Sequence, residues 1–305
     1  MKIVVSGSTG LIGSPLVEAL QRRGDEVVRL IRPPQATTGG ALRWDPERGT
    51  IDRAGLEGVD AVIHLAGENV FGRWSTAKKQ HIRDSRVHGT RLVSDAVAAL
   101  TKRPAVLLAA SAIGYYGDQG DTHLTERSPP PAGRDFLAEV ARDWEAATAS
   151  AARAGVRVVN MRFGVVLTPS GGALGKMLPP FRLGLGGPVG SGKQYVSWIE
   201  LGDVIRAILH LLERSDLSGP VNMTAPSPVT NRELATSLGK VLHRPAGLPV
   251  PAFALRMAFG AEGAAMLQSG QRVLPERLVA SGFKFRFETM EPALRDLLAP
   301  SESGR

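Results

Sequence analysis

The fold is decided by Lys2-Ile3-Val4-Val5-Ser6-Gly7-Ser8-Thr9-Gly10-Leu11-Ile12-Gly13. Its first five residues predict a buried strand, and the residues from Gly13 to about Arg23 predict a helix with an apolar inner face. Glycines at positions 7, 10 and 13 fill the turn between them. Glycine lets this turn close tightly and lets backbone amides approach a pyrophosphate at the positive end of the helix dipole. The seven residues Gly7, Ser8, Thr9, Gly10, Leu11, Ile12 and Gly13 therefore predict a dinucleotide-binding loop, with an ordinary glycine-rich turn as the alternative.

Beyond this loop, short apolar runs alternate with longer stretches of helical spacing. We expect strands at 26–31, 59–65, 105–110 and 156–161, and helices at about 76–100 and 135–154. Glycines then cluster up to Gly192, helices at about 201–213 and 231–242 flank a short strand at 221–224, and 251–298 is mainly helical by pattern. This alternation is typical of a parallel sheet wound with helices.

The expected fold class is therefore α/β, a Rossmann-type doubly wound parallel sheet with a smaller, mainly helical C-terminal region on the substrate side. Residues 1–165 are expected to form the dinucleotide-binding domain, with sheet and helix contributions from about 201–228. Residues 166–200 and 229–299 are expected to form the substrate side. The tail 300–305 should fray, as chain ends often do.

Composition narrows the classes of function. The chain has 305 residues, 43% hydrophobic and 22% charged, and no apolar run approaches the roughly 18 residues that span a bilayer. The net charge of +8 comes from scattered basic residues, so we expect no nucleic-acid partner and no membrane partner. There is no cysteine, and no pair of histidines has metal-ligand spacing, so no metal is expected. A cytoplasmic location is the default expectation, and a homodimer is suggested only by analogy of fold.

The choice of cofactor depends on the end of the second strand. An NAD site usually places an acidic residue there to bind the ribose 2′-hydroxyl. Here the strand ends in Arg32, followed by Pro33 and Pro34, while Asp25 and Glu26 lie at its opposite end. A guanidinium suits the 2′-phosphate of NADP. NADP is therefore favoured over NAD, unless Arg32 is simply a solvent-facing arginine.

The remaining cofactor contacts are expected at the carboxyl ends of the other strands, where open α/β sheets bind ligands. The segment Leu65-Ala66-Gly67-Glu68 is placed near the ribose and diphosphate, Ser111 near the nicotinamide ribose, and Arg162 to Val165 near the ring. Arg86, about two turns into the long helix, could reach a phosphate, or it could pair with a neighbouring acid such as Asp84.

Several of these segments together resemble a known family. The glycine loop, His64-Leu65-Ala66-Gly67 and Ser111 resemble the extended short-chain dehydrogenases/reductases of the NAD(P)-dependent epimerase/dehydratase superfamily. The atypical "epimerase family protein" subgroup is matched more narrowly, by Ala66-Gly67-Glu68-Asn69, Gly72-Arg73-Trp74, 82–86, 111–117, 182–188 and 269–275. That subgroup carries a C-terminal domain of unknown function, which corresponds here to about residues 250–298. The resemblance covers essentially the whole chain.

One element of the superfamily is missing. Short-chain dehydrogenases use a Tyr-x-x-x-Lys pair on the helix after the fifth strand, where the lysine lowers the tyrosine pKa so that the phenol acts as a general acid/base. The corresponding stretch, 135–145, contains neither tyrosine nor lysine. With Glu145 placed where relatives often have an acid, Leu137 and Ala141 occupy the positions of the pair. The resemblance therefore implies a cofactor without fixing a reaction.

Other side chains are candidates for the missing role. Ser111 could hydrogen-bond a substrate carbonyl, Tyr115 follows it at the mouth of the sheet, and Glu68 or Asp135 could act as a base. The alternatives are that Tyr115 and Tyr116 pack against the cofactor and that the acids cap helices or bind ribose. Trp74, Trp198 and Phe181 are expected either to line an apolar substrate pocket or to pack in the core.

Three functions remain open at this point. The first is an NADP-dependent oxidoreductase or epimerase-like enzyme acting on an unknown small molecule. The second is a non-catalytic NADP(H)-binding protein with a structural or redox-sensing role, which the lost pair favours. The third is a nucleotide-sugar epimerase or dehydratase, which the lost pair disfavours because those enzymes need the tyrosine.

Overall fold

The core of the fold is one eight-stranded sheet, seen in a computed structural model that describes residues 1–32 and 40–299. Its strands lie in the order β12-β8-β6-β5-β1-β2-β3-β4, and all neighbours are parallel except β3 and β4. The strands are β1 (Lys2–Ser6), β2 (Glu26–Ile31), β3 (Leu42–Asp45), β4 (Thr50–Ile51), β5 (Ala61–His64), β6 (Val106–Ala112), β8 (Arg157–Phe163) and β12 (Gly219–Met223). The expected Rossmann-type sheet is therefore present, and its carboxyl edge is the place to look for a ligand.

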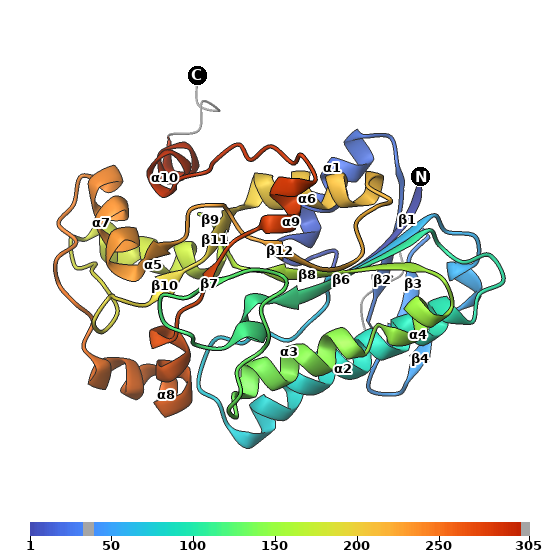
Figure 1. Cartoon of the computed structure of the whole chain (residues 1–305), viewed down its shortest axis with the longest axis horizontal. Helices are drawn as coiled ribbons and strands as arrows, with labels where there is room; N and C mark the ends of the chain where they lie inside the picture. Colours follow the sequence, from blue (N-terminus) through green and yellow to red (C-terminus); the bar gives the residue numbers. More distant parts are fainter. Residues whose placement is uncertain (33–39, 300–305) are drawn as a thin grey trace.

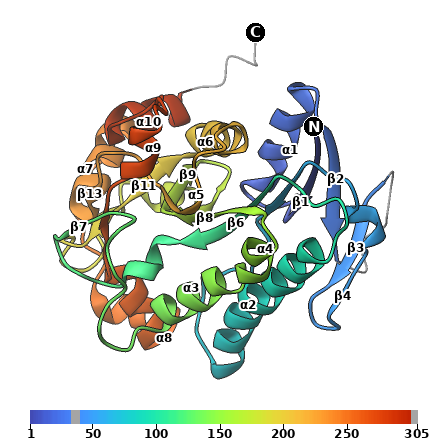
Figure 2. The ribbon, with the colours of Figure 1, turned by 45° about the vertical axis from the view of Figure 1, so that its right-hand side comes forward.

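Helices cover both faces of this sheet (Figures 1 and 2). One face packs against α1 (Gly13–Arg22) and α6 (Leu201–Glu213), and its core includes Leu16, Leu20 and Ile208, all fully buried. The other face packs against α2 (Thr76–Ala98), α3 (Phe136–Ala146) and α4 (Ala149–Arg153). Burying apolar side chains in two layers fixes the sheet and leaves its strand ends open.

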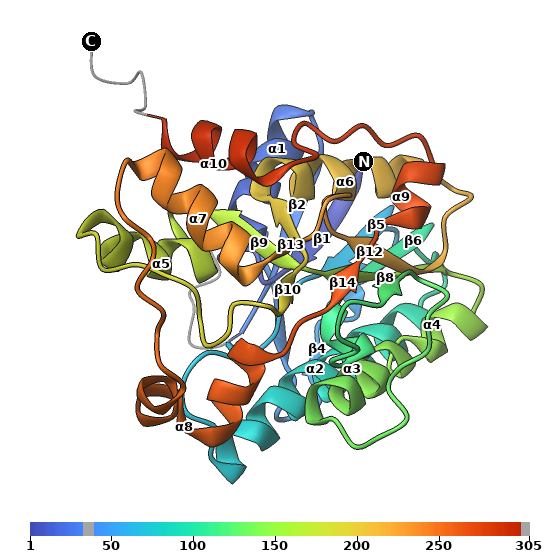
Figure 3. The same cartoon turned by 60° about the vertical axis from the view of Figure 1, so that its left-hand side comes forward.

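Residues 166–200 and 229–299, which were expected to form the substrate side, have a core of their own. Buried side chains of α5 (Gly172–Arg182), α7 (Asn231–Leu242) and α10 (Met290–Leu298) pack together around Trp198, which is fully buried. Short strand pairs join β9 (Val165–Thr168) to β11 (Trp198–Glu200) and β10 (Tyr195–Val196) to β13 (Val229–Thr230). Figure 3 shows α5, α7 and α8 (Ala252–Gln268) together at one end of the molecule.

The C-terminal segment is also connected to the main sheet. Strand β14 (Arg272–Val273) pairs with β7 (His123–Leu124), and α9 (Glu276–Ala280) packs against β12. Arg277 donates hydrogen bonds to the Ser218 and Pro220 carbonyl oxygens on that edge strand. The helical C-terminal region thus covers an edge of the sheet that would otherwise expose backbone groups.

The structure differs from the expectations in a few places. The predicted helix 135–154 is two helices, because the chain turns at Ala147 and Thr148, where the Thr148 hydroxyl donates to the Glu145 carbonyl oxygen. Strands β6 and β8 each run two residues further than predicted. Strands β3, β4, β7, β9, β10, β11, β13 and β14 have no counterpart among the predicted elements. The expected fraying of 300–305 lies outside the described residues.

Within residues 1–32 and 40–299, no helix is long and apolar enough to cross a membrane.

Candidate dinucleotide-binding site

The glycine loop lies between β1 and α1 and against the end of β5. Gly7 has φ +65°, and a Cβ on it would lie 2.9 Å from the Ala66 backbone nitrogen. A Cβ on Gly13 would lie 2.0 Å from the Gly7 carbonyl oxygen. The Ser6 hydroxyl accepts hydrogen bonds from the Leu65 and Ala66 amides, which fixes the neighbouring strand end to the loop. Any side chain at position 7 or 13 would force these backbones apart.

The first turn of α1 leaves backbone donors available. Its Ile12 N-cap makes no side-chain hydrogen bond, while Gly10 donates to Gly7 and Ser14 donates to Gly10. The amides of Leu11, Ile12 and Gly13 have no acceptor within the described part of the chain. Unpaired amides at a helix N-terminus, together with the helix dipole, suit an anion such as a pyrophosphate.

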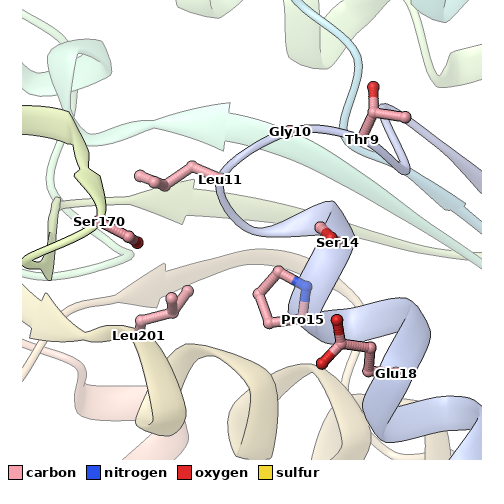
Figure 4. Close-up of a pocket in the computed structure, with 8 residues that line it drawn as sticks. All are labelled: Thr9, Gly10, Leu11, Ser14, Pro15, Glu18, Ser170 and Leu201. Carbon is pink, nitrogen blue, oxygen red and sulfur yellow. The ribbon is translucent and has the colours of Figure 1, made fainter.

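A hollow of about 330 Å³ adjoins this loop (Figure 4). Leu11, Ser170 and Leu201 lie on one side of it, and Pro15 and Glu18 of α1 lie on the other. The hydroxyls of Thr9, Ser14 and Ser170 give it a partly polar lining. A phosphate fits the loop end of this hollow better than the end beside the Glu18 carboxylate.

Two arginines lie on the β2 side of the edge, where the adenosine of a dinucleotide is expected. Arg32 follows β2 directly and is exposed. Arg29, which no sequence motif marks, reaches from β2 to the carbonyl oxygen of Ser8 at 3.5 Å. Glu68 lies on the loop after β5 and is bound to Lys78, with Nζ and Oε1 2.6 Å apart. This hydrogen bond from Lys78 lowers the pKa of Glu68, so that Glu68 is a weakened base.

Arg86 lies under Gly67 at the end of β5. Its Nη1 donates to the Ile82 carbonyl oxygen, and its guanidinium stacks 4.9 Å from the ring of Trp144. Burial lowers its pKa to about 10. Arg86 makes no ion pair with any described residue, and the predicted partner Asp84 instead accepts from Gln80. Glu68 favours the charged form of Arg86 without forming an ion pair with it. A half-buried cation that lacks a direct ion pair suits an anionic ligand.

Ser111 and Arg162 face into the protein, not toward the open edge. Because β6 and β8 extend further than expected, the two residues are register partners within the sheet, each 2% exposed. Both bind Glu145 of α3. Ser111 Oγ donates to Oε1 at 2.7 Å, and Arg162 forms a bidentate pair through Nε and Nη2 at 2.7 and 2.8 Å. Although burial disfavours its charge, Arg162 has a raised pKa because Glu145 stabilises the cation.

The two adjacent tyrosines have different surroundings. Tyr116 is fully buried, and its hydroxyl donates to Asn222 Oδ1 and accepts from Arg162 Nη1. Burial raises the pKa of Tyr116 to about 12. Tyr115 is half-buried, its ring stacks 3.5 Å from the Arg162 guanidinium, and its hydroxyl bonds to no described residue. Of the pair, only Tyr115 presents a hydroxyl that a ligand could reach.

The positions of the missing Tyr-x-x-x-Lys pair are apolar in space as well as in sequence. The half-buried Leu137 has its Cβ 3.5 Å from where a Cβ on Gly114 would be, and Ala141 is buried. Asp135, a candidate base, is the N-cap of α3, and its Oδ1 accepts from the Ala138 amide. Val165, expected near the nicotinamide ring, begins β9 and is half-buried beside the edge.

The three aromatic residues considered for an apolar pocket divide into two groups. Trp198 and Phe181 belong to the core of the substrate-side region, at 0% and 3% exposure. Trp74 is half-buried on the loop between β5 and α2, edge-on to Phe136 at 5.6 Å. Only Trp74 remains available to a ligand.

Some residues of this region had no sequence signal for their roles. The sequence shows only that Glu145 lies where relatives often have an acid. Its hydrogen bonds to Ser111 and Arg162 depend on how α3 packs over β6 and β8. The Asn222 side chain joins the Tyr116 hydroxyl to the Leu274 carbonyl oxygen, and the Asn222 backbone N–H donates to Oε1 of the buried Glu126. Burial raises the pKa of Glu126, and its Oε2 has no partner among the described residues. Residues 1–32 and 40–299 contain no cluster of three or more His, Cys, Asp or Glu side chains that could hold a metal ion.

Comparison with known proteins agrees with this geometry. The model of the "NAD dependent epimerase/dehydratase family" matches residues 3–223, and a "domain of unknown function (DUF1731)" matches residues 250–297. An epimerase family protein of Mycobacterium bovis is 45% identical over 96% of both chains, and the human epimerase family protein SDR39U1 is 37% identical over 98% of this chain and all of its own. These matches confirm the resemblance inferred from the motifs.

Solved structures show the same fold. The human epimerase family protein SDR39U1, crystallised with NADPH, superposes with a TM-score of 0.88 at 36% identity, covering 97% of this chain and 99% of that one. A structure described as a nucleoside-diphosphate sugar epimerase of Corynebacterium glutamicum has a TM-score of 0.78 at 35% identity, covering 97% of this chain and 58% of that one.

Proposed function

The chain belongs to the NAD dependent epimerase/dehydratase family, and on this basis we propose that it binds NADPH and acts as an oxidoreductase or epimerase-like enzyme on a small molecule. The observation that carries the proposal is the glycine loop. Three unpaired amides at the N-terminus of α1 lie where side chains at positions 7 and 13 cannot fit. This combination suits a pyrophosphate, and a merely structural turn does not require it.

The arginines of the edge support the choice of NADPH over NADH. Exposed Arg32 follows β2, where the ribose 2′ position of a dinucleotide is expected. Arg86, without a counter-ion among the described residues, lies beside Gly67 where it would face the diphosphate or ribose. The NADPH in the human relative is consistent with this assignment. We assign the cofactor contacts to Gly7, Ser8, Thr9, Gly10, Leu11, Ile12, Gly13, Arg32, Leu65, Ala66, Gly67, Glu68 and Arg86, with Val165 beside the nicotinamide.

Ser111 and Arg162 have a different place in this proposal. Their side chains are bound to Glu145 beneath the edge, so we assign them to positioning the end of β6 and the stretch after it. A direct hydrogen bond from Ser111 to a substrate carbonyl would require its bond to Glu145 to break.

The proposal is tested by exchanging one charge. Arg32→Glu should weaken NADPH binding about 10- to 100-fold, since a hydrogen bond to a charged group contributes roughly 1.5–3 kcal/mol, while NADH affinity changes little. Titration of NADPH and NADH fluorescence measures both. Arg91→Glu is the matched control, because Arg91 is exposed on α2 away from the edge and should leave both affinities unchanged. An unchanged NADPH-to-NADH ratio in Arg32→Glu contradicts the 2′-phosphate assignment.

A second candidate function is binding of NADPH without turnover, in a structural or redox-sensing role. The apolar side chains of Leu137 and Ala141 favour it, because the usual proton donor is lost. The same loss argues against a nucleotide-sugar epimerase or dehydratase of the usual kind. Absence of NADPH oxidation across a broad panel of acceptors, by protein that binds NADPH, would favour this second function.

A further inference from the structure

The polar side chains beneath the carboxyl ends of β6 and β8 bind one another through hydrogen bonds and an ion pair. Ser111, Arg162 and Tyr116 are each at most 2% exposed and bind Glu145 or Asn222. Glu68 is held by Lys78 and Asp135 caps α3. Tyr115 differs from these residues, because its hydroxyl bonds to no described residue while its ring is fixed against Arg162.

Apolar side chains also contribute to the surface at this edge. Half-buried residues line the strand ends where a nicotinamide would lie, namely Leu65, Gly114, Leu137, Phe163 and Val165. Half-buried aromatic rings flank them on the loop before α2 and at the start of α3, namely Phe71, Trp74 and Phe136. Half-buried apolar and aromatic side chains of this kind are suited to flat, apolar ligands.

The lack of a positioned proton donor limits which kinds of acceptor can be reduced at this site. Reduction of an ordinary ketone or aldehyde produces a strongly basic alkoxide, which a positioned acid must protonate, and such an acid contributes about 10²- to 10⁴-fold in rate. Reduction of a quinone or an isoalloxazine instead produces an anion whose charge spreads over a conjugated ring system. Such an anion needs no proton from the protein.

We propose that the substrate is a planar, conjugated hydride acceptor of the quinone or isoalloxazine class, bound against Leu137 and the aromatic side chains at the edge. This inference rests on the proposed NADPH site. The acceptor receives one hydride, two electrons with a proton, as the C4–H bond of the dihydronicotinamide breaks and NADP⁺ forms. The reduced acceptor leaves as a delocalised anion and takes its second proton from water.

A cation beside one of these aromatic rings suits an acceptor that gains negative charge. The Lys176 ammonium lies 3.9 Å from the ring of Phe71, bridging α5 and the loop after β5. Lys176 forms no ion pair with any described residue. Its charge can therefore offset that of a reduced acceptor next to Phe71.

The activity test compares three acceptors under the same conditions. Menadione represents quinones, riboflavin represents isoalloxazines, and p-nitrobenzaldehyde represents simple carbonyls, with the rate without protein subtracted. We expect NADPH oxidation with menadione or riboflavin to exceed that with the aldehyde by at least about 100-fold in kcat/KM. Comparison of the menadione and riboflavin rates shows whether quinones or isoalloxazines are preferred. An aldehyde rate equal to the better of the other two overturns the proposal.

Restoring the missing pair gives a gain-of-function test. In Leu137→Tyr/Ala141→Lys, a proton donor and its supporting cation return to α3, so the rate with p-nitrobenzaldehyde should rise relative to that with menadione by about 10²-fold or more. Tyr115→Phe tests the rival interpretation that Tyr115 supplies the proton. A loss of more than tenfold in menadione reduction by Tyr115→Phe, with NADPH affinity retained, overturns the proposal.

A binding measurement needs no turnover. Protein saturated with NADP⁺ should quench riboflavin fluorescence or bind menadione by calorimetry, and Leu137→Glu should abolish this binding. Leu183→Glu is the matched control, because Leu183 is 74% exposed on the loop after α5. Protein that binds NADPH but neither binds nor reduces menadione or riboflavin overturns the acceptor proposal and leaves the cofactor proposal standing. Failure to bind NADPH overturns both.

Discussion

The two halves of the carboxyl edge use their polar groups in opposite ways. At the glycine-loop half, the amides of Leu11, Ile12 and Gly13 have no acceptor among the described residues, and the guanidinium of Arg86 forms no ion pair with them. At the β6–β8–α3 half, Ser111, Glu145 and Arg162 satisfy one another beneath the surface, and Leu137 faces the edge. Unpaired polar groups at a helix N-terminus are available to a ligand, whereas side chains that bind one another stabilise the fold. On the proposed function, the first half would bind the cofactor and the second would lack the usual acid/base pair.

The largest expected effect comes from breaking the buried ion pair. Arg162→Met should destabilise the protein by about 3–5 kcal/mol, because it leaves the Glu145 carboxylate buried without its partner. Urea unfolding measures the change. Arg127→Met removes an exposed pair with Glu276, whose side chains are 82% and 42% exposed, and should cost about 0–1 kcal/mol. Equal losses of unfolding free energy in the two variants would show that the network of Ser111, Glu145 and Arg162 does not stabilise the fold.

The glycine loop should be the next most sensitive site. In Gly13→Ala the new Cβ meets the Gly7 carbonyl oxygen, so the loop must shift, at a cost of about 1–3 kcal/mol, and the amides that face the pyrophosphate shift with it. NADPH affinity should fall at least about tenfold in a fluorescence titration. Gly133→Ala is the control, since no atom lies within 4 Å of where its new methyl group would be, and it should bind NADPH as the wild type does. If Gly13→Ala bound NADPH with wild-type affinity, the glycine loop could not be part of the cofactor site.

A smaller effect concerns the pH dependence of stability through Glu126. Burial raises the pKa of Glu126 in the folded protein above its unfolded-state pKa of about 4.3. The stabilisation that the protonated Glu126 gives the fold is therefore fully present below about pH 4.3 and is lost as the pH rises through the folded-state pKa. Glu126→Gln removes this ionisation. Between pH 4 and 7, the stability of Glu126→Gln relative to the wild type should therefore increase with pH in urea unfolding. A difference that stays constant over this range would mean that Glu126 ionises normally.

Local sequence pattern predicted where the glycine loop and Arg32 lie, and it did not predict the side-chain contacts at the ends of β6 and β8. The glycine spacing and the position of Arg32 after β2 follow from the chain near one strand, where backbone conformation decides the outcome. Ser111 and Arg162 were expected at the ends of their strands, but β6 and β8 continue past them and turn both side chains toward α3. Their partner Glu145 comes from a different element, so the pairing depends on packing that residue spacing does not reveal.

The same limit applies to the aromatic residues. Trp198 and Phe181 are large apolar side chains in a glycine-rich stretch, a pattern that fits a pocket or a core equally well. Packing of α5 against α7 and α10 places them in the core. Trp74 differs because the loop after β5 leaves it half-buried beside Phe136.

If the β6–β8–α3 half of the edge supplies no proton, hydride transfer should not depend on the ionisation of any protein group. The single-turnover rate of NADPH oxidation by excess menadione, measured from pH 6 to 9, tests this point without interference from product release. We expect measurable oxidation whose rate is independent of pH over this range, because no side chain must donate a proton as the hydride moves. A rate that follows the ionisation of a single group, and loses that dependence in Tyr115→Phe, would instead show that Tyr115 is the proton donor.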